Sequence, residues 1–318
     1  MEVFNDLENI KGNEQAAVAL GNFDGVHLGH QELIRQTVGL AQEKGVKSAV
    51  FTFSNHPRNL IPGNEPVKNI LYEDEKRSLI ESLGVDYLYE IPFTEEIMKL
   101  EAEDFVTEIL LARLRMTTAV CGFNYQFGAR AFGTSEYLEL WGKKYGFDVY
   151  EMGPYEVDGN VVSSSLIRTI IEAGYVQKCR AYMGRNYEIA GEVVVGNRLG
   201  RKLGFPTSNL LIDDSMVTPP NGVYVTYCDY NGVRYPSITN IGVKPTITKD
   251  VAENVVEAGE KSVETHIFDF DKELYGKRIV VEFLRKMRDE QKFGSVEELS
   301  AQIVKDCEAA RAWFEKNK

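Results

Sequence analysis

Close pairs of cysteines are missing from this chain, and basic residues are fewer than acidic ones, 36 against 48. Its four cysteines, Cys121, Cys179, Cys228 and Cys307, are widely spaced, so none forms the Cys-x-x-Cys pair of a zinc ribbon or a redox motif. We expect them to be buried, reduced thiols. The net charge is −12 at pH 7. Because an acidic surface repels a phosphate backbone, we expect no nucleic-acid partner.

Long apolar runs are also absent. None approaches the roughly 20 residues that a membrane-spanning helix needs. The first residues, MEVFNDLENIKGNEQ, carry acids early and lack the apolar core of a secretory signal. We therefore expect a cytoplasmic protein with no membrane partner. A chain of 318 residues, 43% hydrophobic and 26% charged, has a globular composition and a length that predicts two domains.

The pattern of apolar residues changes near residue 180. Before that point, short apolar runs such as 47–53 and 117–123 alternate with helical patterns such as 31–45 and 135–146. This alternation predicts βαβ units and a mostly parallel sheet, whose ligands bind beyond the carboxyl ends of the strands. A helix predicted over 165–184 closes this half. We assign residues 1–183 to a first, α/β domain.

After about residue 180, strand-like runs are separated by turn signals, as over 187–196, 221–242 and 277–284. Asn231-Gly232 lies between two aromatic and β-branched runs and predicts a tight hairpin. We expect a small antiparallel β-barrel over 184–318. It ends in an amphipathic helix, for which Ser295 is the predicted N-cap.

Two of the four histidines stand in the stretch AVALGNFDGVHLGH, residues 17–30. A strand ends before Gly21 and a helical pattern begins at Gln31, so His27 and His30 open a helix and share one of its faces. Helix N-termini favour anions, and imidazole donors there can stabilise negative charge on a phosphate. The same residues could merely cap a tight turn or form half of a metal site. The stretch lacks the spacing of dinucleotide and P-loop signatures.

A second candidate anion site is GNRLGRKLGFPTSN, residues 196–209. Its glycines can expose backbone N–H groups to phosphate, and Thr207 and Asn209 offer neutral oxygens that suit Mg²⁺. The alternative is an exposed basic loop in which Pro206 forms a turn.

Two further stretches of the first half allow a site or a plain structural role. In SSSLIR, Ser164 or Ser165 can cap a helix from which Arg168 reaches an anion, or the helix is simply capped. FNYQFGARAFG suits a flat, partly anionic ligand, or is an aromatic loop broken by glycines.

The first half resembles the nucleotidyltransferase superfamily, and bacterial FAD synthetases in particular, through GNFDGVHLGH. HPRNLIP (56–62), GFNYQFGARAFGT (122–134) and SSSLIR (163–168) agree with that family in order. The resemblance implies a Rossmann-like domain in which His27 and His30 bind ATP phosphates during adenylyl transfer to FMN. It implies ATP or phosphate contacts by Gly21, Asn22, Phe23, Asp24, Gly29, Ser164 and Arg168, and flavin contacts by Asn124, Tyr125 and Phe127.

The second half resembles riboflavin kinases through 196–209, TNIGVKPTI (239–247), ETHIFDFDKELYG (264–276) and 283–303. This resemblance implies that Glu264 takes the proton from the riboflavin 5′-hydroxyl and that Thr207 and Asn209 bind Mg²⁺ with ATP. It further implies ATP contacts by Gly196, Arg201, Gly204 and Phe205, and makes Arg288 a flavin-binding candidate.

Taken together, the chain is similar to the bifunctional bacterial riboflavin kinase/FAD synthetases. The resemblance implies an enzyme that phosphorylates riboflavin to FMN and adenylylates FMN to FAD, with riboflavin, FMN and ATP as substrates and Mg²⁺ as cofactor. The alternative is an adenylyltransferase with one activity, acting on another phosphate monoester, whose barrel is a binding module. The acidic segment 251–262 has little turn chemistry, and the sequence does not predict its local structure.

Overall fold

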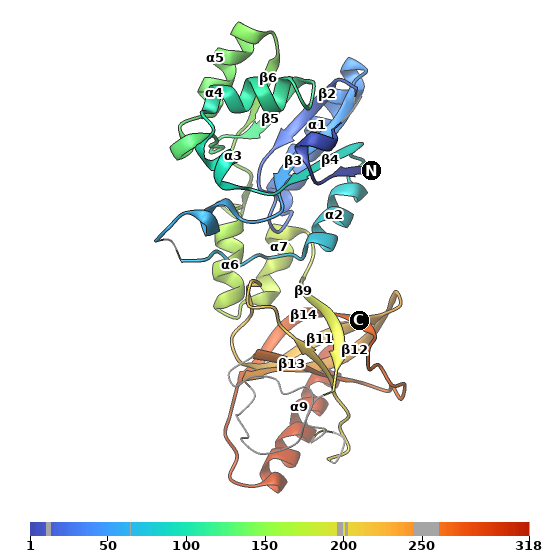
Figure 1. Cartoon of the computed structure of the whole chain (residues 1–318). Coiled ribbons are helices and arrows are strands. Elements are labelled where there is room, and N and C mark those ends of the chain that lie inside the picture. The colour runs from blue at the N-terminus through green and yellow to red at the C-terminus, as the bar shows by residue number, and fades with distance from the viewer. Residues whose placement is uncertain (11–13, 64, 196–199, 201–202, 244–260, 318) are drawn as a thin grey trace. The chain divides into compact units, whose positions relative to one another are not determined.

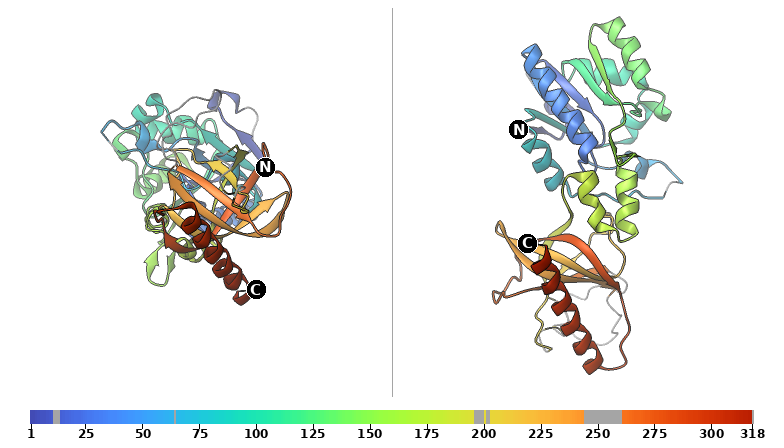
Figure 2. Two further views of the ribbon diagram at one scale, coloured as in Figure 1. Left: turned by 90° about the horizontal axis from the view of Figure 1, so that it is seen from below. Right: turned by 180° about the vertical axis from the view of Figure 1, so that it is seen from behind.

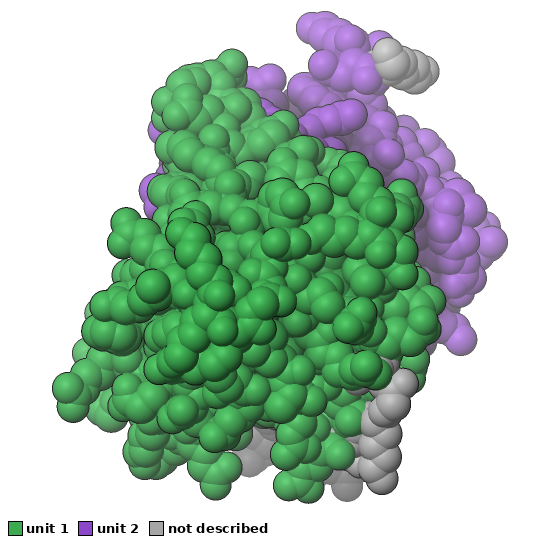
Figure 3. All heavy atoms as spheres, turned by 90° about the horizontal axis from the view of Figure 1, so that it is seen from above, with its two compact units in different colours: residues 1–166 green, residues 167–318 purple. Residues whose placement is uncertain are grey.

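A computed structural model describes residues 1–10, 14–63, 65–195, 200, 203–243 and 261–317 of the chain. It divides into two compact units, Met1–Leu166 and Ile167–Lys318 (Figure 3). The division falls within helix α6 (Ser164–Glu172), upstream of the domain boundary at 183/184 that the sequence predicts. Among the described residues, none of the helices is both long and apolar enough to cross a membrane.

The first unit is built on a six-stranded sheet with the order β1-β4-β3-β2-β5-β6 (Figure 1). Every neighbouring pair in it is parallel, which confirms the predicted α/β architecture. The strands are β1 (Glu2–Phe4), β2 (Ala16–Leu20), β3 (Lys47–Phe53), β4 (Tyr87–Ile91), β5 (Met116–Gly122) and β6 (Asp148–Met152). A separate two-stranded hairpin joins β7 (Glu156–Val157) to β8 (Asn160–Val161).

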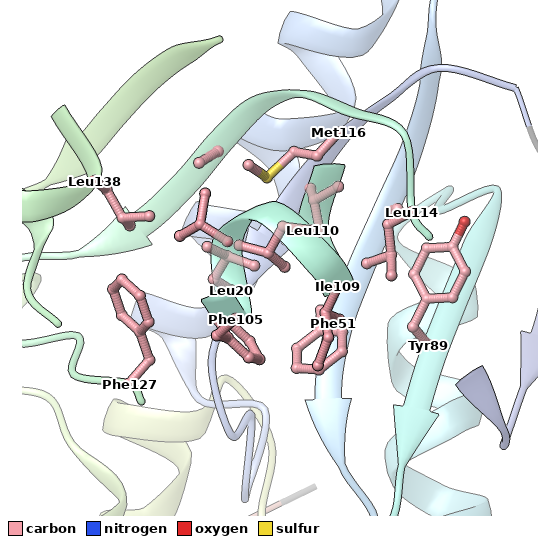
Figure 4. Packing of buried hydrophobic residues seen from close by; sticks show 14 of the residues in the cluster. Leu20, Phe51, Tyr89, Phe105, Ile109, Leu110, Leu114, Met116, Phe127 and Leu138 are labelled. Atoms are coloured by element: carbon pink, nitrogen blue, oxygen red, sulfur yellow. The ribbon is translucent and has the colours of Figure 1, made fainter. Parts of the chain in front are cut away.

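Both faces of this sheet are covered, because successive strand residues point to opposite sides. Leu20, Phe51 and Tyr89 pack on one face against Phe105 and the residues after it (Figure 4). Ala19, Val50 and Leu88 pack on the other face against α1 and α2. The helices are α1 (Leu28–Lys44), α2 (Glu73–Ser82), α3 (Glu95–Lys99), α4 (Ala102–Asp104), a π-helix (Phe105–Leu111) and α5 (Ser135–Tyr145).

The prediction of a single helix over 165–184 is wrong. The chain forms α6, then a short 3-10 helix (Val176–Lys178), then α7 (Cys179–Met183). Gly174 has a φ of +80°, which L-residues rarely adopt, and its N–H donates to the carbonyl of Ile171 at 2.9 Å. A left-handed glycine of this kind ends a helix.

The second unit contains a closed antiparallel barrel with the order β10-β13-β12-β11-β14-β9, as predicted. Asn231 and Gly232 join β11 to β12 with φ values of 54° and 77°, which is the backbone of a two-residue hairpin. The strands are β9 (Tyr187–Val194), β10 (Ser208–Leu211), β11 (Gly222–Tyr230), β12 (Val233–Val243), β13 (Lys261–Ile267) and β14 (Arg278–Asp289).

Helix α9 (Val296–Lys316) packs along the outside of this barrel (Figure 2). Cys307, Ala310 and Phe314 form a buried cluster with outward-facing strand residues that include Val223 and Val225. The Ser295 side chain accepts a hydrogen bond from the N–H of Glu298 at 3.2 Å, which confirms the predicted N-cap.

The four cysteines are free and buried, as predicted. Burial raises the pKa of Cys121, Cys179 and Cys228 to about 12 and that of Cys307 to about 11. The thiolate is the reactive form of cysteine, so we expect the native protein to react with a disulfide reagent far more slowly than free cysteine does. In the unfolded protein all four thiols should react rapidly, consuming four equivalents of the reagent. A native thiol that reacts as fast as free cysteine at pH 8 would contradict this burial.

Candidate active sites

The loop between β2 and α1 lies at the carboxyl edge of the parallel sheet. β2 pairs with β3 on one side and β5 on the other, and the chain leaves β2 toward α1 and β3. The strand order therefore reverses between β2 and β5, which is where open α/β sheets bind ligands. The sequence stretch that contains the two histidines starts at this point.

His27 is the N-cap of α1, and its ring lies against that of His30. The His27 Nδ1 accepts a hydrogen bond from the backbone N–H of His30 at 3.2 Å, so the proton of the neutral ring is on Nε2. The two rings are stacked, with centroids 3.5 Å apart and planes at 16°. His27 is 6% exposed and His30 is half-buried. The pair therefore places two imidazoles side by side at a helix N-terminus.

The backbone of this loop is strained at two residues that are not glycine. Phe23 has a φ of 49° and Val26 a φ of 35°. Each such residue costs about 1–3 kcal/mol and persists only where its surroundings hold it. The loop is held by Asp24, whose carboxylate accepts from the N–H of Ile70 at 2.9 Å and whose carbonyl accepts from the Ser164 hydroxyl at 2.8 Å. Strain of this kind is typical of functional sites.

The glycines of the loop have packing reasons of their own. A Cβ on Gly21 would lie 3.2 Å from the Phe23 ring. One on Gly29 would lie 3.3 Å from the ring of His27 and from the Cβ of Tyr155. These glycines therefore allow the aromatic rings to pack closely, in addition to any approach by a phosphate.

The stretch that carries Asn124 follows β5, the strand next to β2, so both segments leave the same edge of the sheet. Asn124 is exposed. The rings of Tyr125 and Phe127 are stacked with centroids 5.4 Å apart, and burial raises the pKa of Tyr125, which stays protonated. Phe127 is 7% exposed and packs in the core against Phe105.

Helix α6 begins one residue earlier than expected. The hydroxyl of Ser163 accepts from the N–H of Leu166 at 3.2 Å, so the cap is Ser163 and the predicted cap at Ser164 or Ser165 is wrong. Ser164 instead donates to Asp24. Arg168 lies one helical turn further along α6.

Two candidate residues of the second unit, Glu264 and Asn209, lie side by side on the outer face of the barrel. Glu264 on β13 pairs in register with Asn209 on β10 and with Asn240 on β12. Directly opposed residues of antiparallel strands point to the same side of a sheet. The alternate residues Val263 and Thr265 are fully buried inside the barrel, whereas Glu264 is half-buried. The sequence did not identify Asn240 as a candidate site residue, although it lies in the stretch 239–247 that resembles riboflavin kinases.

Asn209 and Thr207 form a group of neutral oxygens beside a pocket of about 170 Å³. The Asn209 Nδ2 lies 3.5 Å from both the carbonyl and the hydroxyl oxygen of Thr207. Asn209 is 4% exposed, and its Oδ1 is buried with no hydrogen-bond partner among the described residues. Hard, neutral oxygens of this kind fit Mg²⁺ that is also bound by phosphate and water.

The loop before β10 is fixed at several points. The N–H groups of Leu203 and Phe205 donate to the carbonyl of Gly200, where a Cβ would lie 2.4 Å from the Phe205 carbonyl. The Nδ1 of His266 lies 2.8 Å from the Pro206 carbonyl. Gly204 has a φ of +86°. Gly196, Arg201 and the segment 251–260 lie outside the described residues.

Arg288 is part of an ion pair between β14 and α9. Its Nε lies 3.1 Å from both carboxylate oxygens of Asp306, and its Nη2 lies 2.7 Å from one of them. Its Nη1 donates to the Asp289 carbonyl at 2.9 Å. These bonds give Arg288 a structural role, and its contact with flavin stays a prediction.

Comparison with known proteins assigns a family model to each half. The model described as FAD synthetase matches residues 9–166, and the model described as riboflavin kinase matches residues 183–314. The first range covers the parallel sheet except its edge strand β1, and the second covers the barrel and most of α9.

Relatives match along nearly the whole length. A Bacillus subtilis (strain 168) protein named bifunctional riboflavin kinase/FMN adenylyltransferase is 35% identical over 94% of this chain and 93% of its own length. A Pseudomonas fluorescens protein of the same name is 35% identical over 98% of this chain and 97% of its own. A solved structure described as a macrolide-efflux protein from Streptococcus pneumoniae is 30% identical, with a TM-score of 0.85 and coverage of 98% of both chains.

Proposed function

The chain belongs to the family of bifunctional riboflavin kinase/FMN adenylyltransferases, and from this premise we propose which residues carry out each reaction. The enzyme phosphorylates riboflavin to FMN with ATP, and it adenylylates FMN to FAD with a second ATP, releasing pyrophosphate. An adenylyltransferase with a single activity is not favoured, because the riboflavin kinase model matches the barrel half. The proposal rests chiefly on one observation, that the histidine loop lies in the first unit and that Glu264 with Asn209 lies in the second.

In the first unit, His27 and His30 bind the phosphates of ATP while an oxygen of the FMN phosphate attacks the α-phosphorus. The bond from the α-phosphorus to the bridging oxygen breaks, and pyrophosphate leaves. The proton on His27 Nε2 and the dipole of α1 stabilise the negative charge that develops on the transferring group. The histidines form no covalent bond, so the enzyme returns unchanged.

Other predicted contacts of the adenylyltransferase half belong to the same proposal. Gly21 through Asp24, Gly29 and Ser164 bind ATP, and Asn124, Tyr125 and Phe127 bind the flavin. Arg168, which follows the division between the units on α6, is also proposed to bind ATP. The support is that β2 and β5 end at the same edge of the sheet. The bond from Ser164 to Asp24 also links the start of α6 to the histidine loop.

In the barrel, Glu264 accepts the proton of the riboflavin 5′-hydroxyl as its oxygen attacks the γ-phosphorus, and ADP leaves. A carboxylate suits this step because the alcohol loses its proton only as it attacks. The pairing of Glu264 with Asn209 and Asn240 supports the assignment. Thr207 and Asn209 would hold Mg²⁺, which neutralises phosphate charge when bound. Gly196, Arg201, Gly204 and Phe205 are proposed to contact ATP, and Arg288 the flavin.

Three further parts of the proposal rest on the sequence. They are the requirement for Mg²⁺, the absence of nucleic-acid and membrane partners, and the cytoplasmic location. The acidic net charge and the need for ATP in both reactions support them.

We expect the purified protein to convert riboflavin to FMN with release of ADP, and FMN to FAD with release of pyrophosphate, in the presence of ATP and Mg²⁺. Chromatography of the flavins over time checks this, and leaving out Mg²⁺ should stop both steps. If a folded protein supplied with ATP and Mg²⁺ forms no FMN, the kinase assignment is wrong. If it forms no FAD from supplied FMN, the adenylyltransferase assignment is wrong.

A further inference from the structure

A buried chain of polar contacts lies behind the histidine loop. Lys76 on α2 is 7% exposed, and its Nζ lies 3.1 Å from the Oε1 of Glu90, a carboxylate with no exposed surface. The same Nζ donates to the carbonyl of Phe53 at 3.0 Å and to the Thr52 hydroxyl at 3.4 Å. The Thr52 hydroxyl in turn donates to the carbonyl of Asn22 at 2.9 Å. The chain thus runs from a buried ion pair to the backbone of the loop.

The donor and the acceptor of each hydrogen bond in this network are fixed by the chemistry of the side chains. Lys76 only donates, so the Thr52 oxygen accepts from it and uses its single proton for Asn22. Glu90 also pairs with Arg77, so the buried carboxylate has two cationic partners. The ion pair therefore fixes Lys76, and Lys76 fixes the orientation of the Thr52 hydroxyl.

The carbonyl that Thr52 holds belongs to a strained part of the loop. The C=O of Asn22 and the N–H of Phe23 form one planar peptide group, so fixing the carbonyl also fixes the N–H. Phe23 has a φ of 49°, and rotation of this peptide group is the local route by which that strain would relax. The Phe23 ring, which would turn with its backbone, packs edge-on against His30 with centroids 5.1 Å apart.

We propose that Thr52, oriented by Lys76 and Glu90, is a positioning residue for adenylyl transfer. It holds the Asn22–Phe23 peptide in its strained orientation and so keeps His30 in place, without touching a substrate. This inference rests on the proposed function of the histidines.

Thr52→Val tests the proposal, because valine keeps the shape of threonine and removes only the hydroxyl. We expect kcat for FMN adenylylation to fall about tenfold, which is about 1.4 kcal/mol and matches the upper range of a single neutral hydrogen bond. Thr52→Ser keeps the hydroxyl and should recover most of the rate. The rate of riboflavin phosphorylation should not change in either variant.

Thr118→Val is the matched control. Thr118 has no exposed surface and accepts from Lys44 at 2.7 Å. It lies near the amino end of β5 and pairs with Ala17 of β2, four residues before the loop begins at Gly21. A role in stability alone would lower the midpoint of thermal unfolding for both valine variants and leave both adenylylation rates near that of the parent. The proposal predicts a loss of kcat for Thr52→Val only. If Thr52→Val does not fold, Thr52→Cys and Thr118→Cys give the same comparison, since a thiol is a weak donor.

Two results overturn the proposal: an unchanged kcat in Thr52→Val, or an equal loss of kcat in Thr118→Val. Failure of the proposed function is a different result, because the parent protein itself would then make no FAD from FMN.

Discussion

FMN adenylylation should fall at least a hundredfold when His27 or His30 is replaced by alanine, while riboflavin phosphorylation continues at the parent rate. Donors aimed at charge that develops in a transition state are typically worth a factor of about 10² to 10³. His27 is buried and carries its proton on Nε2, and His30 is stacked on it at 3.5 Å. Rates of FAD formation from supplied FMN, measured beside rates of FMN formation from riboflavin, check this prediction.

His27 also caps α1, so its removal combines two effects. Loss of a cap costs about 1 kcal/mol of stability. His27→Asn separates the two, because an asparagine side chain can accept from the His30 N–H but offers no Nε2 donor. We expect His27→Asn to unfold near the parent temperature and to adenylylate FMN as slowly as His27→Ala. If His27→Asn is as active as the parent, the histidine only caps the helix.

Glu264→Gln should phosphorylate riboflavin at least a hundredfold more slowly than the parent. Glutamine keeps the size and the hydrogen bonding of the side chain but does not accept the proton, and a general base contributes about 10² to 10⁴ in rate. Binding of Mg²⁺ and ATP should change little, because Thr207 and Asn209 are untouched. FMN supplied directly should be converted to FAD at the normal rate, since the histidines belong to the other unit.

Glu192→Gln provides the matched control for this variant. Glu192 is an exposed carboxylate on β9 of the same barrel, so its replacement makes the same chemical change at a residue that is not among the candidate side chains. We expect it to phosphorylate riboflavin like the parent. If Glu264→Gln phosphorylates riboflavin as fast as Glu192→Gln does, Glu264 is not the base and has only a structural role in its strand.

The parts of the fold that depend on local pattern could be predicted from the sequence. The alternation of strands and helices indicated the parallel sheet, Asn231-Gly232 indicated the hairpin, and Ser295 indicated the start of α9. The histidine loop could be found for the same reason, because a strand, a turn and a helix follow one another within 15 residues (16–30).

The parts that depend on distant contacts could not be predicted. Asn240 lies 24 residues before Glu264 in the sequence, and only the register of β12 against β13 brings them together. The contacts of Thr52 with Lys76 and Asn22 likewise depend on how α2 packs on the sheet. The break at Gly174 was missed because apolar residues continue at helical spacing through it.

The central claim is that one chain carries two reactions on two separate groups of residues. A single chromatographic time course of the flavins tests it most directly, with the parent, His27→Asn and Glu264→Gln each supplied first with riboflavin and then with FMN. The account predicts that His27→Asn stops at FMN, and that Glu264→Gln leaves riboflavin unchanged but converts supplied FMN to FAD. Loss of both reactions in either variant, with circular dichroism and thermal unfolding like those of the parent, would contradict it.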